Sequence, residues 1–311
     1  MNKLRTLKEI YDKEGLQSVL KECREYLFIN GPAAPYIKSI LGRRIHHKLY
    51  MYLRLGYWPN IKNPRSFNEK LLHRKLYTNN ELFSVVEDKW RVREYVSKKV
   101  GDDILTEVYH ITDDPSTIPF KQLPEEYVIK PTHLSGGANF IIDKESCPPN
   151  FEIIEKTCSQ WLNKTYGQMK EEYWYLNITP RIMVEEYIDS NKYKAPIDYK
   201  FMVFHGEVKF IHATYNRFDD KETERVFYDN NWNEIDVALY FKQGKGIPKP
   251  PKFNKMIKIA EKLGEDFEHV RIDLYNPNET DVYFGEITVA ESSGGNPFVP
   301  REYDFKFGSY W

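Results

Sequence analysis

The sequence predicts an α+β protein with mixed or antiparallel sheets. Residues 1 to about 80 have a mainly helical pattern, whereas short apolar, β-branched runs dominate the second half of the chain. Several of these runs are separated only by turn residues, which is typical of hairpins. No internal repeat, low-complexity tract or clear linker divides the chain, so we expect one large domain or two to three closely packed ones.

Helical patterns occupy four regions. The first is the N-terminal region, which the turn residues N-P-R at 63–65 interrupt. The second covers 88–100, with Asp88 as its N-cap and Gly101 at its C′ position. The other two are expected over about 151–172 and over 256–264, where apolar residues recur on one face.

Strands fill the rest of the chain. Their β-branched and aromatic residues, bounded by Gly, Pro and Asn, favour buried strands and hairpins. The predicted strands are E-Y-V-I-K-P (126–131), F-I-I-D (140–143), R-I-M-V-E-E-Y-I (181–188), a hairpin over 199–215 that turns at His205 and Gly206, and a second hairpin over 271–289 that turns through N-P-N-E-T.

The composition is that of a soluble globular protein. Of the 311 residues, 41% are apolar and 29% are charged, and the net charge of −1 argues against a general nucleic-acid binder. No apolar run approaches the ~20 residues of a membrane span, and the charged N-terminus lacks the apolar core of a signal peptide. The three cysteines have no metal-ligand spacing. These features predict a cytoplasmic protein.

One segment has a different charge balance. Between Tyr26 and Asn68 the chain has seven Lys or Arg residues and no Asp or Glu, and it is rich in Tyr and Leu. We call the part that holds these charges, residues 38–65, the basic segment. Two interpretations are open. The basic segment is either the solvated face of a packed helix or a surface that contacts an anionic membrane or an acidic polymer. Contact with a membrane would place the protein peripherally at its inner face.

Two carboxylates in the last hairpin need a counter-charge. Asp273 and Glu286 lie 13 residues apart, on strands that a short turn would make neighbours. Opposed like charges destabilise a hairpin, and a buried carboxylate needs a cation. Mg²⁺, completed by water and phosphate oxygens, would satisfy both. Arg271 shares a strand face with Asp273 and could stabilise charge during phosphoryl transfer. A buried ion cluster without metal, or exposed strand ends, are the alternatives.

The turn T-H-L-S-G-G-A-N (132–139) is the candidate phosphate cradle. Its adjacent glycines and small polar residues let backbone N–H groups surround an anion, and Lys130 ends the strand before it. It is not a P-loop, because G-K-[ST] is absent and a strand follows. An ordinary Gly-Gly turn without a ligand is the alternative.

Other charged residues are individually weak signals. Lys89 lies at the start of a helix, where the helix dipole does not favour a cation. Glu185 and Glu186 interrupt an otherwise apolar strand, so one faces inward or the strand is an edge. Asp198 precedes the 199–215 hairpin. The order of these residues along the chain is more informative than any one of them.

That order resembles the ATP-grasp superfamily, and more closely its TupA-like (teichuronopeptide biosynthesis) branch. Each motif alone is unspecific, but the ordered set is specific and covers residues 60 to 311. The motifs are S-F-N-E-K (66–70), E-D-K-W-R-V-R-E-Y-V (87–96), E-Y-V-I-K-P-T-H-L-S-G-G-A-N (126–139), R-I-M-V-E-E-Y-I (181–188), D-Y-K-F-M-V-F-H-G (198–206), V-R-I-D-L-Y (270–275) and Y-F-G-E-I-T-V-A-E-S-S-G-G-N-P-F (283–298).

The resemblance implies an ATP-grasp fold, in which two α+β subdomains clamp ATP, with a mainly helical N-terminal extension. The implied parts are a helical, basic N-terminal region (1–84), a reduced N-terminal lobe (85–124), a lid subdomain with the glycine-rich flap (125–187) and a C-terminal subdomain with the metal site (188–311).

It also implies roles for the matching residues. Lys89 and Lys130 would contact ATP phosphates beneath the mobile 132–139 flap, and Arg271 and Lys130 would be catalytic. Asp273 and Glu286 would bind Mg²⁺. Thr288 stands where many members have Asn, which leaves open whether one or two ions bind. Further nucleotide contacts are expected from Ser135, Gly136, Gly137, Glu185, Glu186, Tyr187, Ile188 (hinge strand) and Asp198 (ribose).

The implied reaction is ATP-dependent ligation of a carboxylate to an amine through an acyl phosphate. In the TupA-like branch the implied role is bacterial surface-polysaccharide synthesis, joining an amino acid or other amine to a uronic acid. Such an acidic, lipid-linked acceptor would suit the basic segment. The candidate acceptor contacts are an anion nest at Ser292, Ser293, Gly294 and Gly295 and carboxylate clamps at Arg217, Arg225 and Arg301, each of which has a surface salt bridge as its alternative.

Three other functions are considered. A kinase of a sugar or lipid-linked acceptor would keep every ATP residue and differ only in the acceptor. A glycosyltransferase of the same pathway would want a D-x-D motif, which the sequence lacks. A non-catalytic nucleotide-binding module would be expected to lose Asp273, Glu286 or Arg271, and all three are present.

Overall fold

The computed structural model describes most of the chain. The described residues are 7–8, 11–12, 15–136, 139–145, 149–189, 196–216, 223–239 and 242–311. Two of the predicted site residues, Gly137 and Arg217, lie outside them.

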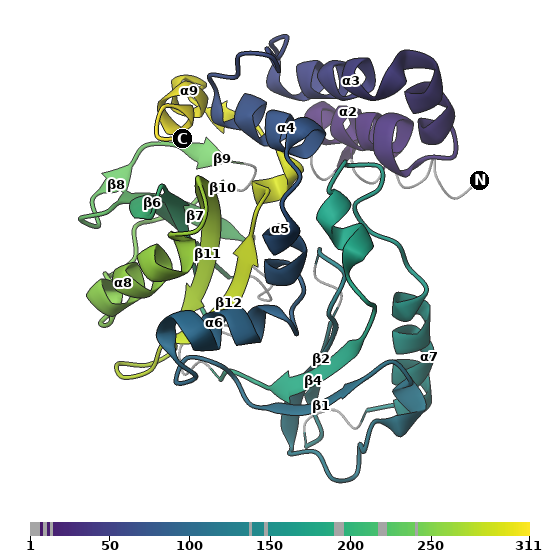
Figure 1. Cartoon of the computed structure of the whole chain (residues 1–311), viewed down its shortest axis with the longest axis vertical. Helices are drawn as coiled ribbons and strands as arrows, with labels where there is room; N and C mark the ends of the chain where they lie inside the picture. Colours follow the sequence, from purple (N-terminus) through teal and green to yellow (C-terminus); the bar gives the residue numbers. More distant parts are fainter. Residues whose placement is uncertain are drawn as a thin grey trace.

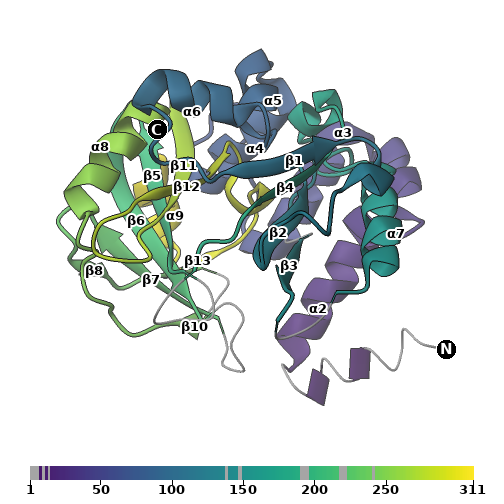
Figure 2. The ribbon, with the colours of Figure 1, turned by 90° about the horizontal axis from the view of Figure 1, so that it is seen from below.

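Figure 1 shows a helical N-terminal region along one end of the molecule and two sheets side by side below it. The turned view in Figure 2 shows the same two sheets on either side, with α4 and α5 between them and α6 beside α8 on the side of the larger sheet. The α+β class predicted from the sequence is confirmed.

The N-terminal region is helical as expected. Its helix α3 bends at Gly42, which has a φ of 72°, and α4 begins with a capping box in which Ser66 and Glu69 exchange hydrogen bonds. The elements are α2 (Leu16–Glu25), a π-helical turn η1 (Tyr26–Asn30), α3 (Ala34–Leu55), α4 (Phe67–Tyr77), α5 (Glu81–Val86) and α6 (Val92–Val100).

Two predicted helix boundaries are corrected. Helix α6 begins at Val92 rather than Asp88, because the Asp88 carboxylate caps the preceding turn by accepting from the N–H of Trp90 at 2.9 Å. The helix predicted over 151–172 ends at Leu162, and Gly167 beyond it has a φ of 88°, which a continuing helix cannot contain.

The smaller sheet is antiparallel, with the order β1-β4-β2-β3. Its hydrophobic core includes Tyr127, Ile129, Val184 and, from α7, Trp161. The elements are β1 (Val108–Thr112), η2 (Pro115–Thr117), β2 (Glu126–Pro131), β3 (Phe140–Asp143), α7 (Phe151–Leu162), η3 (Tyr173–Asn177) and β4 (Ile182–Glu186).

The larger sheet has the order β10-β7-β6-β5-β11-β12, and β5 and β6 form the predicted hairpin through His205 and Gly206. Its neighbours pair antiparallel, except that β10 and β7 are parallel. β8 pairs with β7, whereas β9 and β13 form a separate two-stranded sheet. The elements of this part of the chain are β5 (Asp198–Phe204), β6 (Glu207–Tyr215), β7 (Glu224–Asp229), β8 (Glu234–Ile235), β9 (Ala238–Leu239), β10 (Lys242–Gln243), α8 (Phe253–Gly264), β11 (His269–Tyr275), β12 (Tyr283–Thr288), η4 (Glu291–Ser293), β13 (Phe298–Val299) and α9 (Glu302–Gly308).

Residues 85–124, the predicted reduced lobe, do not share a core of their own. Val92, Val96 and Ile104 join the core of the larger sheet, whereas Ile118 and Phe120 join that of the smaller one. The remaining predicted boundaries stay a proposal.

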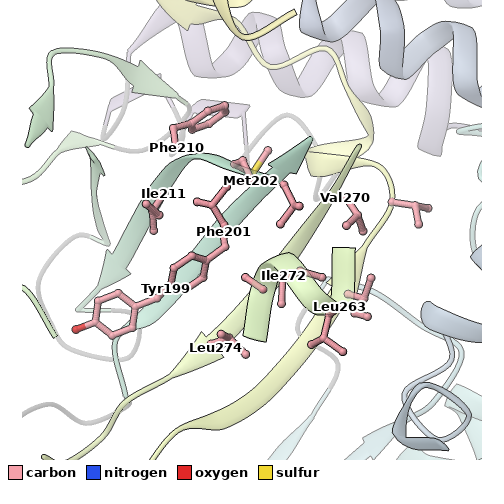
Figure 3. Close-up of a cluster of buried hydrophobic side chains, with 14 of the residues drawn as sticks. Tyr199, Phe201, Met202, Phe210, Ile211, Leu263, Val270, Ile272 and Leu274 are labelled. Carbon is pink, nitrogen blue, oxygen red and sulfur yellow. The ribbon is translucent and has the colours of Figure 1, made fainter. Parts of the chain in front are cut away.

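Apolar and charged residues alternate along β5 and β11, so their side chains lie on opposite faces of the larger sheet. Phe201 and Ile272 are directly paired in the sheet and pack with Leu263 of α8, as Figure 3 shows. Because successive side chains of a strand point to opposite faces, the neighbouring residues Lys200 and Asp273, also paired, face away from α8. The large sheet therefore presents an apolar face to α8 and a charged face toward the smaller sheet.

Candidate active site

The charged face is built by strand register. On β11, Asp273 is paired with Glu286 of β12 on one side and with Lys200 of β5 on the other. Lys200 is paired in turn with His212 of β6. The sequence prediction that Asp273 and Glu286 become neighbours is confirmed.

Arg271 is the main counter-charge of this face. Its Nε and Nη2 atoms donate to the two oxygens of Asp273 at 2.6 and 2.7 Å, and its guanidinium also forms ion pairs with Glu286 and Glu291. Lys200 is the second cation, because its Nζ lies 2.7 Å from Asp198 Oδ2 and also pairs with Asp273. Sequence reasoning predicted Arg271 but missed Lys200.

The two paired carboxylates have opposite pKa shifts. Burial raises the pKa of Asp273 to about 7, although Arg271 and Lys200 act against it. Burial also acts to raise the pKa of Glu286, but Arg271, Lys200 and Lys89 outweigh it and lower that pKa to about 2. The Glu286 side chain is 43% exposed and that of Asp273 only 2%. Glu286 is thus the accessible, charged edge of the pair.

These residues fit a magnesium ion whose remaining ligands come from a bound phosphate group and water. Within the described part of the chain, no group of three or more His, Cys, Asp or Glu side chains could hold a metal by itself. Mg²⁺ is commonly bound through one or two carboxylates together with substrate phosphates and water, which Asp273 and Glu286 can provide. Thr288 lies beside them, and its hydroxyl donates to Glu286 Oε1 at 3.1 Å.

A pocket lies between the two sheets at the hinge strand β4. Its lining includes the predicted hinge residues together with side chains of β2 and of the β11–β12 hairpin. They are Thr106, Val128, Lys130, Asn139, Ile141, Glu185, Glu186, Tyr187, Ile188, Pro196, Tyr275, Phe284 and Gly285. Apolar walls with a few polar groups are typical of small-molecule and cofactor sites.

Glu185 is the hinge acid that faces inward. It forms an ion pair with Lys130, accepts from the hydroxyl of Thr106 at 3.0 Å and is buried. β4 lies between β1 and β2, so the alternative that this strand is an edge is wrong. Glu186 accepts from the N–H of Glu107 at 3.1 Å instead.

Lys89 joins the charged face to the flap. Its Nζ donates to the carbonyl of Leu134 at 2.6 Å, and its N–H donates to the carbonyl of Thr132 at 3.2 Å. Burial lowers the pKa of Lys89, and Glu286 acts to raise it. Ser135 and Gly136 of the flap line a second pocket, together with Leu134, Trp161, Lys164, Thr165 and Tyr166.

Asp198 is not part of the hinge pocket. Its carboxylate is paired with Lys200 on the charged face and is 3% exposed, so a contact with a ribose would require that pair to open.

In the expected anion nest at 292–295, three of the four N–H groups already have acceptors. The N–H groups of Ser293, Gly294 and Gly295 donate to the carbonyls of Ala290 and Glu291 and to Asn68 Oδ1. This prediction is corrected, since a nest binds an anion only through unpaired N–H groups.

The remaining candidate clamps differ in exposure. Arg225 is 5% exposed, and its Nε donates to the hydroxyl of Thr214 at 3.4 Å. Its register partner Thr214 lies opposite Asp198, so Arg225 shares the charged face. Arg301 is exposed at the start of α9 and packs over the ring of Tyr57 at 5.6 Å.

Besides Lys200, two acidic residues, Glu291 and Glu87, were also not predicted from the sequence. Glu291 is buried and ion-paired with Arg271. Glu87 accepts from the N–H of Val289 at 2.8 Å and from the Tyr175 hydroxyl at 2.5 Å, which connects β12 to η3. A carboxylate within an apolar stretch, as in V-A-E-S-S, was the available signal for Glu291.

A lysine-flanked flap and a hinge pocket thus face a carboxylate pair across two sheets. Residue types in such an arrangement are suited to binding a phosphate-bearing ligand together with a metal ion. Residues 69–311 match the family model described as TupA-like ATPgrasp. The chain belongs to this family, which confirms the ATP-grasp fold expected from the sequence motifs.

Several solved structures resemble the chain at low identity. D-alanine–D-alanine ligase from Bacillus anthracis, complexed with ATP, is 14% identical with a TM-score of 0.41, over 67% of this chain and 56% of that one. L-amino acid ligase from Bacillus licheniformis is 14% identical with a TM-score of 0.45, over 77% and 51%. The ATP-grasp ligase PsnB, complexed with minimal precursor, Mg and ADP, is 10% identical with a TM-score of 0.37, over 83% and 65%.

The chain spans just over half the length of the D-alanine–D-alanine ligase that it matches. Because these TM-scores are low, the assignment rests on the family match. No curated protein sequence matches the chain. Among the described residues, no helix has the length and apolar character needed to span a membrane.

Proposed function

We propose that the protein is an Mg²⁺- and ATP-dependent carboxylate–amine ligase that forms an amide through an acyl phosphate. The observation that carries this proposal is the register that places Asp273 opposite Glu286 with Arg271 bridging them. The solved ATP-grasp enzymes named above contain ATP, or Mg and ADP, which supports the same cofactors here.

The residues divide the work of phosphoryl transfer. Asp273 and Glu286 would hold Mg²⁺, which when bound supplies charge neutralisation on the phosphates. Lys89 and Lys130 lie beside the flap and the hinge pocket, where they can bind and orient phosphate oxygens. The 132–139 flap would exclude water from the reactive acyl phosphate. No protein nucleophile is required.

The hinge pocket is the proposed adenine site. Glu185, Glu186, Tyr187 and Ile188 line it together with apolar side chains such as Val128 and Phe284. Backbone and carboxylate groups of the hinge would read the polar edge of the base, while the apolar walls cover its faces.

The acceptor is proposed to be a uronic-acid carboxylate of a bacterial surface polysaccharide, joined to an amino acid or another amine. The match to the TupA-like family supports this role. Arg225, which lies on the charged face, is the candidate carboxylate clamp that its position favours. We place the reaction in the cytoplasm.

The deciding experiment supplies ATP and Mg²⁺ with panels of uronic acids and amino acids. ADP release that requires both a carboxylate and an amine, with an amide product found by mass spectrometry, is expected. ADP release with a single partner and a stable phosphate ester would instead identify a kinase and overturn the ligase.

We further propose peripheral contact between the N-terminal helices and an anionic membrane that carries a lipid-linked acceptor. Lys38 and Arg43 of the basic segment pair with Glu171, but Tyr36 and Ile40, one turn apart on α3, are 73% and 84% exposed. Exposed apolar side chains near basic ones favour a lipid interface over a polysaccharide, which offers no hydrocarbon.

Vesicle sedimentation tests this contact separately from catalysis. Retention at low salt on vesicles with anionic lipid but not on neutral ones is expected, and Ile40→Ser should reduce it, whereas Ile153→Ser, another exposed isoleucine, should not. If anionic vesicles fail to retain the protein, the membrane proposal is wrong and the ligase proposal is unaffected.

A further inference from the structure

Three carboxylates surround the guanidinium of Arg271. Two of them, Asp273 and Glu286, are the proposed metal ligands. The third is Glu291, which accepts from Nη1 of Arg271 and is 3% exposed. Its other oxygen accepts from the Ser292 hydroxyl at 2.9 Å, so both Glu291 oxygens have a donor.

Metal binding changes what Arg271 can pair with. Oxygens of Asp273 and Glu286 that ligated a cation would no longer accept all the hydrogen bonds that Arg271 donates in this structure. A buried guanidinium left without a carboxylate is strongly unfavourable. Glu291 is the partner that Arg271 can keep.

We infer that Glu291 is a positioning residue that retains Arg271 in the site while Asp273 and Glu286 turn to the metal, an inference that rests on the proposed function. It holds one end of the guanidinium and leaves the other end for the transferred phosphoryl group. Because the guanidinium presents its donors in a fixed planar fork, a carboxylate held at Nη1 sets the direction in which the other nitrogens point.

The segment after Glu291 fixes its position from outside the sheet. Four consecutive residues, Ser292 to Gly295, have φ values of 50°, 60°, 68° and 84°. Left-handed backbone is unfavourable at the two serines and persists only where surrounding contacts impose it. Because Glu291 immediately precedes this segment, such contacts determine where its carboxylate lies.

Helices α3 and α4 supply those contacts. Asn68 Oδ1 accepts from the N–H of Gly295 at 2.6 Å, Arg54 Nε donates to the carbonyl of the same residue at 2.6 Å, and Lys75 Nζ donates to the carbonyl of Ser293 at 2.5 Å. The N-terminal helices therefore reach the catalytic arginine through Glu291.

The test is a double-mutant cycle read out by Mn²⁺ binding to the ADP-loaded protein, measured by electron paramagnetic resonance. Glu291→Gln should weaken Mn²⁺ binding about 10- to 100-fold, because the displaced Arg271 would have no partner. In an Arg271→Met background the same change should have little effect, because no buried guanidinium would then lose its partner.

Two further variants separate this role from simple charge or folding effects. Glu291→Asp keeps the charge but shortens the side chain, so it should also weaken Mn²⁺ binding. Glu265→Gln is the matched control. It changes an exposed, salt-bridged glutamate at the end of α8 and should leave Mn²⁺ binding unchanged. Circular dichroism verifies that each variant is folded.

Equal losses in the two backgrounds, or no loss in Glu291→Gln, would overturn the inference. A wild-type protein that binds no Mn²⁺ with ADP would overturn it as well. Because the assay needs no acceptor, Mn²⁺ coupling without any ligation product would instead count against the proposed ligase function alone.

Discussion

Asp273 and Glu286 stand directly opposite each other on adjacent antiparallel strands, and both accept from one nitrogen, Nη2 of Arg271. Opposed carboxylates repel each other, and the positive charges of Arg271 and Lys200 offset that repulsion here. Arg271 thus supplies positive charge to the same two carboxylates that would bind the proposed Mg²⁺.

Glu286→Gln should abolish turnover while leaving the fold intact. The side chain is 43% exposed, so its neutral isostere disturbs little packing, but it removes a proposed ligand charge. ADP release with ATP, Mg²⁺, a uronic acid and an amine measures the effect. Glu279→Gln, an exposed change in the turn of the same hairpin, should retain activity. Full activity in Glu286→Gln would remove the metal assignment.

Lys200→Met should destabilise the protein by about 3–5 kcal/mol, because it leaves the buried carboxylates of Asp198 and Asp273 without their shared lysine. Urea unfolding at pH 7 measures the change. Lys262→Met breaks a pair with Glu265 whose side chains are 51% and 39% exposed, and should cost less than about 1 kcal/mol. Equal effects of the two variants would contradict a buried ion cluster.

Stability should fall with rising pH in a way that depends on Glu87. Burial raises the pKa of Glu87 to about 8 from 4.5, so the folded state keeps a proton that the unfolded state has lost. This contribution is complete below pH 4.5 and is lost as the pH rises through 8. Unfolding free energies of Glu87→Gln and wild type, measured from pH 5 to 8, should converge or cross in favour of the variant. Parallel profiles would show that Glu87 is ionised in the folded protein.

Ser66→Ala should cost about 1 kcal/mol of unfolding free energy, because the Ser66 hydroxyl accepts from the N–H of Glu69 at the start of α4. Thermal unfolding measures it. Ser309→Ala removes an exposed hydroxyl at the end of α9 and should leave the melting temperature unchanged within about 1 °C. A neutral Ser66→Ala would mean that the cap is replaced by water.

Local patterns predicted much of the large sheet. The hairpin turn at His205 and Gly206 was predicted from adjacent turn residues, and both adopt positive φ. The opposition of Asp273 and Glu286 followed from two strands joined by a short turn. Such features depend on residues that are near one another in the sequence.

The features that were missed depend on distant pairings. Lys200 reaches Asp273, 73 positions away in the sequence, through the register between β5 and β11. The bond between Asn68 and Gly295 joins residues 227 positions apart, and no periodicity reports it. The predicted nest at 292–295 failed partly for the same reason, since Asn68 of α4 accepts from the N–H of Gly295, whereas the N–H groups of Ser293 and Gly294 donate to nearby carbonyls.

The capped start of α4 also bears on where the protein can be shortened. The family match begins at residue 69, inside α4 and beyond its Ser66 cap. A Cβ built on Gly308 would lie 2.2 Å from the carbonyl oxygen of Arg65, so the last helix rests on backbone that precedes the match. A polypeptide that starts at residue 69 would lose both the Ser66 cap and the Arg65 backbone against which α9 packs. We therefore expect a polypeptide that starts at residue 69 to be less stable than one that starts upstream of Ser66.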